Sequence, residues 1–357
     1  MKLLLILENI NIVGGIERVV NMLSNYFYNE FNYEIKIVSI FSQKDDLFFD
    51  FAKGIKIVHY GEKYRTFENK RDENIYYKKI LEDILNASEF DIVMTFYTHI
   101  SKAVIKNKKI IGNSKIVLTE HTDYYKSSWL GRIMKAILYR RADKFVVLSE
   151  EYRKLYSRYL NNVITISNPI SFTTDKISNL KNKKIISLGR LDTSKGFDRI
   201  IDIFKLIDYK CKGWKWEIYG EGNQYEILYE KIKDNGLSDK VILKPFTSNV
   251  KKELLNSSIY ALTSRYEGLP LVLLEAQECG LPCISFDILS ARPIIYNNIN
   301  GIMVSDGNIE AFADKLVELI EDYDKRKKLG ENAKNNAKNY HIDYICNKWR
   351  ELFESIL

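Results

Sequence analysis

The chain has 357 residues, which is too long for one ordinary hydrophobic core and favours two domains. Its composition, 46% hydrophobic and 28% charged, is typical of globular proteins and excludes disordered and collagen-like chains. The net charge of +7 lies mostly in the first half: residues 1–172 hold 26 Lys and Arg against 20 Asp and Glu, a surplus of +6, whereas the remainder holds 28 against 27.

A basic first half indicates an anionic partner there, such as a membrane surface, a phosphate-bearing substrate or a nucleic acid. Nothing in the sequence resembles a zinc finger, an RNA-recognition signature or a basic zipper, so we do not expect nucleic acid as a partner. No apolar run approaches the roughly 20 residues that span a bilayer, and the run 3–7 is too short for a signal sequence. The four cysteines have no disulfide or metal-site spacing, which predicts reduced thiols in a cytosolic protein.

Short apolar runs alternate with helical patterns along the chain, which predicts parallel sheets covered by helices. The expected strands of the first half are 3–7, 34–40, 55–59, 91–96, 115–119, 144–148 and 163–166, with helices between them such as 15–28 and 76–85. Those of the second half are 184–188, 216–219, 241–244, 259–262, 282–286 and 301–304. Residues 171–184 are mostly polar and follow Asn168-Pro169, which is typical of a linker. We therefore predict an α/β chain of two Rossmann-like domains that face each other across a cleft.

Two adjacent glycines, Gly14 and Gly15, follow the first expected strand and open a helix. They do not form the fingerprint Gly-x-Gly-x-x-Gly, which disfavours a dehydrogenase. They still let the backbone approach a ligand, with the amides of the following helix beside it. The alternative is a plain turn, with Glu17 as an ordinary charge in the first turn of the helix.

His121 follows the strand 115–119 within Glu120-His121-Thr122-Asp123. A lone histidine is more often structural, but the end of a parallel strand faces the expected cleft, so His121 is a candidate for ligand contact. Glu120 and Asp123 either orient it or face a bound substrate.

The segment 127–142 predicts an amphipathic helix. Its apolar face holds Trp129, Leu130, Ile133, Met134, Ile137 and Leu138, Arg132 and Lys135 lie opposite, and Arg140 and Arg141 lie near its end. Such a helix either lies on an anionic membrane or faces the core with a solvated basic side. Tyr64-Arg65 and Lys70-Arg71 add headgroup contacts or form a solvated charge run.

The strand 184–188 runs into Gly189-Arg190-Leu191-Asp192-Thr193-Ser194-Lys195-Gly196 and then a helix. Arg190 and Lys195 beside helix amides suit a diphosphate without a metal ion. The alternative is two surface cations on a loop.

The stretch 264–276 carries Glu267 and Glu275 around a loop and an apolar helix. Gly268 permits close backbone approach, and Pro270 suits the first turn of the helix. A carboxylate among leucines is costly unless it accepts hydrogen bonds, for which ribose hydroxyls are suitable donors to Glu275. Glu267 is placed to accept from hexose hydroxyls. The alternative is a helix cap plus an incidental core glutamate.

These motifs together resemble the retaining GT-B glycosyltransferases of family 4, over nearly the whole chain. The matching pieces are Gly14-Gly15-Ile16-Glu17, Thr119-Glu120-His121, Ala142-Asp143-Lys144 through Ser149, Ile166-Ser167-Asn168-Pro169, Gly189-Arg190…Lys195-Gly196, Tyr219-Gly220-Glu221-Gly222, Glu267-x7-Glu275, Pro282 through Asp287, and Asn300-Gly301-Ile302-Met303-Val304. Relatives often carry a Gly-Pro-Arg-Glu-Ile-Ile-like stretch where this chain has Ser290-Ala291-Arg292-Pro293-Ile294-Ile295, which leaves any role of Arg292 open.

The resemblance implies a GT-B fold with an acceptor-binding domain over 1–172, a nucleotide-sugar-binding domain over 173–345 and a helix over 346–357 that returns to the first domain. It also implies residue roles. Arg190 and Lys195 would hold the donor diphosphate, Glu275 would bind the ribose, and the backbone around Pro245-Phe246 would contact the base. Glu267 and the amides of Gly268, Leu269, Pro270 and Leu271 would hold the transferred sugar. Gly14 and Gly15 would approach the distal phosphate, and His121 would contact the donor sugar.

The implied activity is retaining transfer of a hexose from a nucleotide sugar, expected to be UDP-linked, to a carbohydrate. We expect the acceptor to be a lipid-linked intermediate of capsule or O-antigen synthesis, at the inner face of the cell membrane. No metal or other cofactor is expected, since cations and helix dipoles can carry the leaving diphosphate. The alternatives are a nucleotide-sugar epimerase or hydrolase of the same fold, or a non-catalytic sugar-nucleotide-binding protein.

Overall fold

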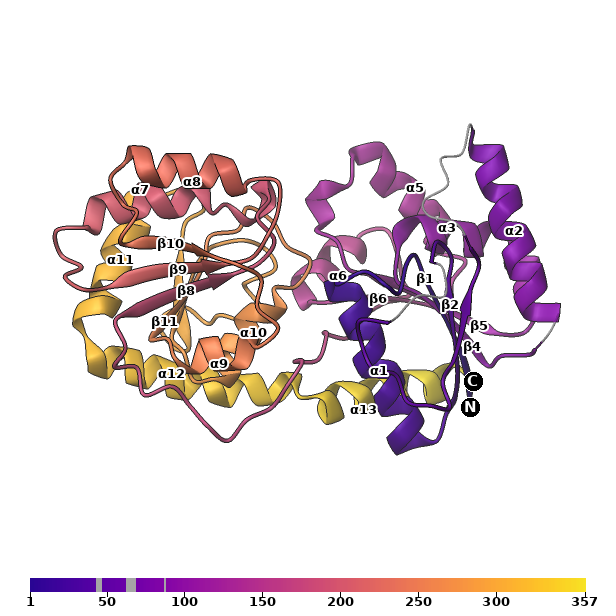
Figure 1. Cartoon of the computed structure of the whole chain (residues 1–357). Helices are drawn as coiled ribbons and strands as arrows, with labels where there is room; N and C mark the ends of the chain where they lie inside the picture. Colours follow the sequence, from indigo (N-terminus) through magenta and orange to yellow (C-terminus); the bar gives the residue numbers. More distant parts are fainter. Residues whose placement is uncertain (43–46, 62–68, 87) are drawn as a thin grey trace. The chain divides into compact units, whose positions relative to one another are not determined.

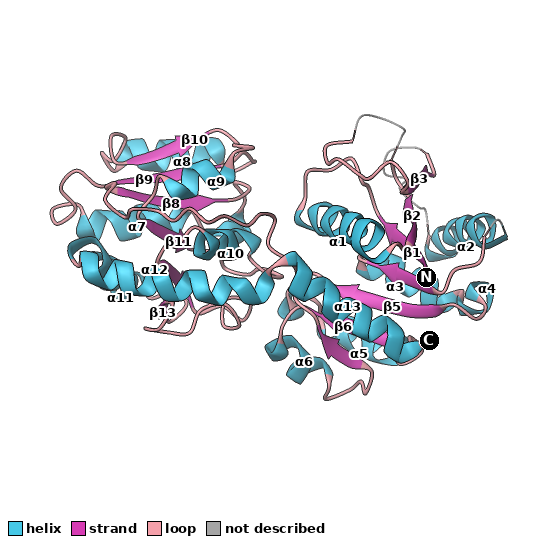
Figure 2. Cartoon of the chain, turned by 90° about the horizontal axis from the view of Figure 1, so that it is seen from below, coloured by secondary structure: helices cyan, strands magenta, loops and turns pink. Residues whose placement is uncertain are grey.

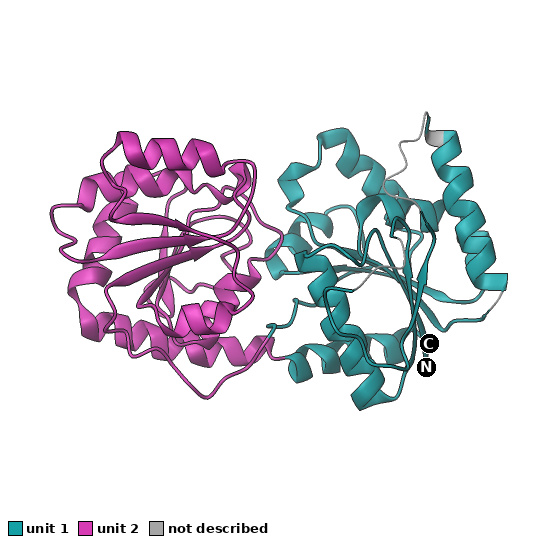
Figure 3. Ribbon diagram, in the orientation of Figure 1, with its two compact units in different colours: residues 1–171, 342–357 teal, residues 172–341 magenta. Residues whose placement is uncertain are grey.

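The computed structural model describes residues 1–42, 47–61, 69–86 and 88–357. The chain divides into two compact units, which Figure 3 colours separately: unit 1 is Met1–Ser171 with Ile342–Leu357, and unit 2 is Phe172–His341. The boundary falls one residue before the expected one. The closing helix joins unit 1 from Ile342 rather than 346, because α13 (Ile342–Ile356) already buries Ile345 in its first turn.

Unit 1 contains a seven-stranded parallel sheet in the order β3-β2-β1-β4-β5-β6-β7 (Figure 1). Its strands are β1 (Lys2–Leu7), β2 (Glu34–Ser39), β3 (Lys56–His59), β4 (Ile92–Thr95), β5 (Lys115–Glu120), β6 (Lys144–Val147) and β7 (Val163–Thr165). Its helices are α1 (Gly15–Phe31), α2 (Lys70–Asn86), α3 (Thr98–Lys106), α4 (Lys108–Ile111), η1 (Tyr124–Lys126), α5 (Trp129–Tyr139), α6 (Glu150–Tyr156) and α13. The rings of Phe27 in α1 and Phe353 in α13 lie 5.7 Å apart, which ties the chain's last helix to its first.

Unit 2 contains a six-stranded parallel sheet in the order β10-β9-β8-β11-β12-β13. Its strands are β8 (Lys184–Leu188), β9 (Lys215–Tyr219), β10 (Val241–Lys244), β11 (Ile259–Leu262), β12 (Cys283–Phe286) and β13 (Gly301–Val304). Its helices are η2 (Thr193–Lys195), α7 (Asp198–Ile207), α8 (Tyr225–Asp234), α9 (Val250–Leu255), α10 (Leu271–Glu278), α11 (Ile309–Glu321), α12 (Tyr323–Ala337) and η3 (Lys338–Tyr340). Figure 2 shows the strands of each sheet side by side among these helices.

Both sheets are Rossmann-like, as expected, and each expected strand is present in the described residues with ends that agree within one residue. The central strands are mostly apolar because helices cover the sheet; in β1, for example, every residue after Lys2 is buried. Strand order reverses between β1 and β4 in unit 1 and between β8 and β11 in unit 2. Such reversals open a crevice at the carboxyl ends of the strands, where α/β folds bind ligands.

Candidate functional site

The loop after β8 is the first part of the candidate site in unit 2. The Asp192 carboxylate caps η2, where it accepts the Ser194 N–H at 2.9 Å and Nε–H of Arg190 at 2.7 Å. Burial raises the pKa of Asp192, but the bonds from Ser194 and Arg190 outweigh burial and hold the pKa below its usual value. The Arg190 side chain is 77% exposed, so Asp192 orients a guanidinium that solvent and anions can still reach.

Lys195 and Glu267 come from two loops far apart in sequence and form an ion pair. Nζ of Lys195 lies 2.6 Å from Oε1 of Glu267, and the Ser264 hydroxyl donates to the same oxygen at 2.8 Å. A Cβ on Gly189 would lie 3.0 Å from Cε of Lys195, so the lysine stem lies across this glycine. β8 and β11 are neighbours in the sheet, and their loops therefore bring a cation and a hydroxyl-accepting carboxylate together.

Glycines bring the backbones of these loops into contact. Gly196 has φ +62°, and a Cβ there would lie 2.3 Å from the carbonyl oxygen of Thr263. A Cβ on Gly220, after β9, would lie 1.9 Å from the carbonyl oxygen of Gly189. Side chains at Gly196 and Gly220 would separate the loops that carry the candidate residues.

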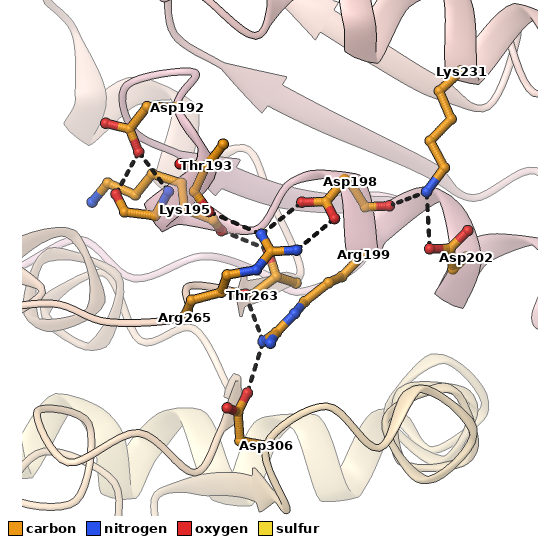
Figure 4. Close-up of polar contacts among 11 residues, drawn as sticks. Asp192, Thr193, Lys195, Asp198, Arg199, Asp202, Lys231, Thr263, Arg265 and Asp306 are labelled. Atoms are coloured by element: carbon orange, nitrogen blue, oxygen red, sulfur yellow. Dashed lines mark hydrogen bonds and ion pairs between the residues drawn. The ribbon is translucent and has the colours of Figure 1, made fainter.

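A network of arginines and aspartates fastens the site loop to α7 (Figure 4). Arg265 donates from both terminal nitrogens to Asp198, at 2.8 and 2.6 Å, and from Nη1 to the Thr193 carbonyl at 2.9 Å. The bonds from Arg265 hold the pKa of Asp198 below its usual value although burial opposes them. Arg199 donates to Asp306 at 2.8 Å. This network was not predicted from the sequence, although Arg265 stands two residues before Glu267.

Helix α10 carries the remaining predicted donor residues. Gly268 and Leu269 lead into Pro270, the residue directly before the helix, and Leu271 is its first residue. Glu275 is fully buried in α10. Phe246, after β10, is 47% exposed. The roles of Glu275 in ribose binding and of Phe246 in base binding stay predictions.

A second buried glutamate of α10, Glu278, was not foreseen. It accepts from Lys334 at 2.6 Å, from the Thr174 N–H at 2.8 Å and pairs with Nε2 of His341 at 3.0 Å. Burial raises its pKa, but the three bonds outweigh burial and keep the pKa below the usual value. Glu278 therefore joins the two ends of unit 2 to α10, which is a structural task.

In the altered loop after β12, the Arg292 side chain donates to both oxygens of Asp287, at 2.7 and 3.2 Å. Arg292 is thus held by a neighbour within its own loop.

The glycine pair of unit 1 stands at the amino end of α1. Gly14 is the N-cap, and a Cβ there would lie 2.1 Å from Oε2 of Glu17, whereas a Cβ on Gly15 would meet nothing within 4 Å. Glu17 is buried and accepts the Tyr97 hydroxyl. Burial raises the pKa of Glu17, and the Tyr97 bond only partly offsets this effect. Glu17 is therefore not an ordinary exposed first-turn charge.

His121 lies directly after β5, with Nε2 3.0 Å from the Thr119 hydroxyl and its ring 5.8 Å from that of Phe96. Burial lowers the pKa of His121 to about 4, although the charge of Glu120 acts in the opposite direction. The imidazole is therefore neutral at pH 7. The Glu120 carboxylate accepts from Lys135 and Thr122, and these bonds hold it toward α5 and its own loop.

Helix α5 corrects one predicted membrane residue. Lys135 is 2% exposed and forms an ion pair with Glu120, which is 5% exposed, so Lys135 cannot touch a membrane. It faces inward because Glu120 at the end of β5 supplies the buried counter-charge.

The apolar side chains of α5 face outward instead, which also overturns the core-facing alternative. Those exposed are Trp129, Leu130, Ile133, Met134 and Ile137. Arg140 and Arg141 are exposed, and Arg132 stacks on the Tyr124 ring with its guanidinium carbon 4.9 Å from the centroid.

Tyr64 and Arg65 lie outside the described residues, as does the side chain of Lys70, while Arg71 is exposed.

Across the described ranges, no group of three or more His, Cys, Asp or Glu side chains is arranged to hold a metal ion. A reaction without a metal stays a prediction. No helix within the described part of the chain has the length and apolarity to cross a bilayer.

Two family models match consecutive parts of the chain. The model for Glycosyltransferase Family 4 matches residues 13–173, and the model for Glycosyl transferases group 1 matches residues 172–336.

Relatives match over the full length. The amylovoran biosynthesis glycosyltransferase AmsD of Erwinia amylovora is 28% identical over 98% of this chain and 99% of its own. A Campylobacter jejuni enzyme that adds α-1,4-N-acetyl-D-galactosamine to a GalNAc-containing diNAcBac-PP-undecaprenol is 26% identical over 100% and 99%. Among solved structures, HepE of Anabaena in complex with UDP and glucose has a TM-score of 0.80 at 15% identity, covering 99% of this chain and 100% of that one. A Staphylococcus aureus TarM variant with UDP also has 0.80, at 16% identity over 99% of both chains.

Proposed function

Since the chain belongs to family 4 of the GT-B glycosyltransferases and is a glycosyltransferase, we propose that it transfers a hexose from a UDP-sugar to a lipid-linked saccharide, with retention at the reacting carbon. The observation that carries the donor assignment is the Lys195–Glu267 pair beside the exposed Arg190, at the point where strand order reverses in unit 2. Relatives named for UDP complexes and for an undecaprenol-linked acceptor support the choice of donor and acceptor.

In this proposal the cations of unit 2 stabilise the leaving diphosphate. Negative charge grows on the diphosphate as its bond to the sugar breaks, and Lys195 and Arg190 stabilise that charge more in the transition state than in the bound donor. Glu267 accepts sugar hydroxyls and holds the ring, while Glu275 accepts from the ribose. The acceptor hydroxyl attacks from the side of the departing diphosphate, which takes up the hydroxyl proton.

We assign acceptor binding to unit 1, and keep Gly14 and Gly15 as the proposed contacts of the distal phosphate and His121 as the proposed contact of the donor sugar. Because the pKa of His121 is about 4, the imidazole donates or accepts a hydrogen bond as a neutral ring and brings no positive charge to the sugar. The outward apolar face of α5 supports membrane attachment of unit 1 at the inner face of the cell membrane, through Trp129, Arg132, Arg140 and Arg141.

A thermal-shift panel with UDP, GDP, ADP and their sugar conjugates tests the donor site. A ligand at 100 times its Kd stabilises the folded state by about 2.7 kcal/mol, so a real donor raises the melting temperature visibly. We expect the shift with UDP compounds, its loss in Lys195→Ala and its retention in Lys205→Ala. Lys205 is an exposed lysine of α7, so it controls for loss of charge alone. A shift that survives in Lys195→Ala would contradict the site.

Product analysis with the same UDP-sugar separates the activities. Transfer requires an added acceptor, whereas free sugar or an epimerised donor without acceptor would instead indicate a hydrolase or an epimerase.

A further inference from the structure

Two hollows adjoin on the outer side of α5 in unit 1. One, of about 540 Å³, is lined by residues of η1, α5 and the segment 155–159. The other, of about 600 Å³, is lined by Arg140, Arg158, Tyr159, Asn161 and Asn162. Arg140, Arg158 and Tyr159 line both, so the two form one continuous groove.

The groove is positively charged. Of the described residues that line it, three are arginines, Arg132, Arg140 and Arg158, and none is Asp or Glu. Guanidinium groups bind phosphate oxygens with two parallel hydrogen bonds, which makes a phosphate the best match for such a lining.

Two of the three arginines are held in place before any ligand arrives. Arg140 donates from Nε and Nη2 to the Tyr159 carbonyl, at 3.2 and 3.1 Å. Arg132 lies on the rings of Tyr124 and Tyr125, 4.9 and 5.9 Å from the centroids. Ordered cations lose less conformational entropy on binding than loose surface lysines do.

The wall that α5 contributes is apolar. Trp129, Ile133 and Ile137 line the groove and are exposed, and Leu130 and Met134 extend the apolar surface beyond it. A soluble phosphate would use the arginines and leave this surface in water, whereas a lipid phosphate would cover both.

We propose that the groove binds the phosphate group of a membrane lipid, with Arg132, Arg140 and Arg158 around the phosphate and the lipid chains against α5. This inference rests on the proposed function and deepens it. It names the part of unit 1 that would bind a lipid of the membrane in which the acceptor is anchored. Arg158 follows α6 and therefore lies outside α5. Because it lines the groove together with the arginines of the α5 segment, the site is more than one basic face of a helix.

Vesicle co-flotation of the full chain tests the proposal. The vesicles contain phosphatidylcholine alone or with 20 mol% phosphatidic acid, whose phosphate is terminal. The test variant is Arg140→Gln/Arg158→Gln. The control is Lys53→Gln/Lys56→Gln, which removes the same charge from exposed positions at and just before β3, the opposite edge strand of the same sheet. Melting temperatures check that both variants fold.

Each basic residue near an anionic surface contributes about a fivefold gain in binding, so the arginine pair should cost about 25-fold on phosphatidic acid vesicles. The lysine pair should cost less than about threefold. Equal losses in both variants would show diffuse attraction without a site, and no loss in the arginine variant would overturn the proposal.

Two further arms complete the design. Inorganic phosphate at the same phosphate concentration should not displace the protein from vesicles; displacement would indicate a site for soluble phosphate and overturn the lipid assignment. The UDP-induced thermal shift reports the donor site of unit 2 separately. Nucleotide binding without vesicle binding refutes this inference and the membrane attachment proposed for α5 but leaves the donor site standing, and vesicle binding without nucleotide binding refutes the proposed transferase chemistry alone.

Discussion

The buried pair Lys135–Glu120 gives the sharpest test of how α5 is attached to unit 1. Lys135→Met keeps the length and apolar stem of the side chain but removes its charge. The Glu120 carboxylate, 5% exposed, would then keep only uncharged donors, namely the hydroxyls of Thr122 and Thr98 and the backbone N–H of Thr122. Removing one partner of a buried ion pair costs about 3–5 kcal/mol, and the remaining uncharged donors place the expected loss at the lower end, about 3 kcal/mol.

For a domain of this size, a loss of about 3 kcal/mol lowers the melting temperature by about 6–12 °C. Calorimetry of the full chain measures this on the transition of unit 1. The double variant Lys135→Met/Glu120→Gln removes the uncompensated carboxylate and should recover most of the loss. Lys106→Met, an exposed lysine of α3, is the matched control and should change stability by less than about 0.5 kcal/mol. A single variant as stable as this control, or a double variant no better than the single one, would refute the reasoning.

Three further predictions follow from individual contacts. Gly14→Ala should lower the melting temperature, because its Cβ would lie 2.1 Å from Oε2 of Glu17, and Glu17→Ala in the same chain should remove the loss. Gly196→Ala should cost about 2 kcal/mol or more and abolish UDP binding, because φ is +62° and the Cβ would lie 2.3 Å from the Thr263 carbonyl oxygen; a normal UDP-induced shift would contradict this. The pKa of His121 is lowered to about 4 in the folded chain. Between pH 6.5 and 4 the unfolded chain therefore binds a proton at this residue and the folded chain does not, so the free energy of unfolding falls as the pH drops through this window. His121→Asn should flatten that fall in urea titrations at pH 4.5 and 7, and an unchanged slope would show that the histidine protonates freely.

The fold was predictable because its signals are local and repeated. Each buried parallel strand is a short apolar run with a helix before the next, so β1 and β8 could be recognised from their own residues. The residues that we propose for the donor could be grouped from the sequence because Arg190 and Lys195 occupy the turn after one strand and Glu267 the turn after another; their roles stay predictions. The ion pair between Lys195 and Glu267 was not predictable, since it depends on β8 and β11 being neighbours in the sheet.

The backbone contacts of the site were also beyond the sequence. Gly196 and Gly220 are needed because a carbonyl oxygen occupies the space of a Cβ, and that oxygen belongs to another loop in each case. The sequence does not distinguish a glycine that is needed for a turn from one that is needed because a neighbouring loop contacts its Cα. Arg265 gave no signal for the same reason, because its partner Asp198 lies on a helix that starts 67 residues earlier.

Helix α5 shows that sequence periodicity identifies the apolar face of a helix but does not show whether that face packs on the core or contacts solvent. The pattern correctly separated the apolar side chains from Lys135, yet an apolar face usually meets the core, and here it meets solvent. The inward face instead carries a buried ion pair, which apolar residues of similar volume would replace at no cost in stability or with a gain. Trp129 at 63% and Leu130 at 65% exposure bury only a minor part of their apolar surface. A helix selected for stability alone would turn the other way, so the inversion itself indicates that the outward face is used, and the arginines of the adjoining groove indicate that its partner is anionic.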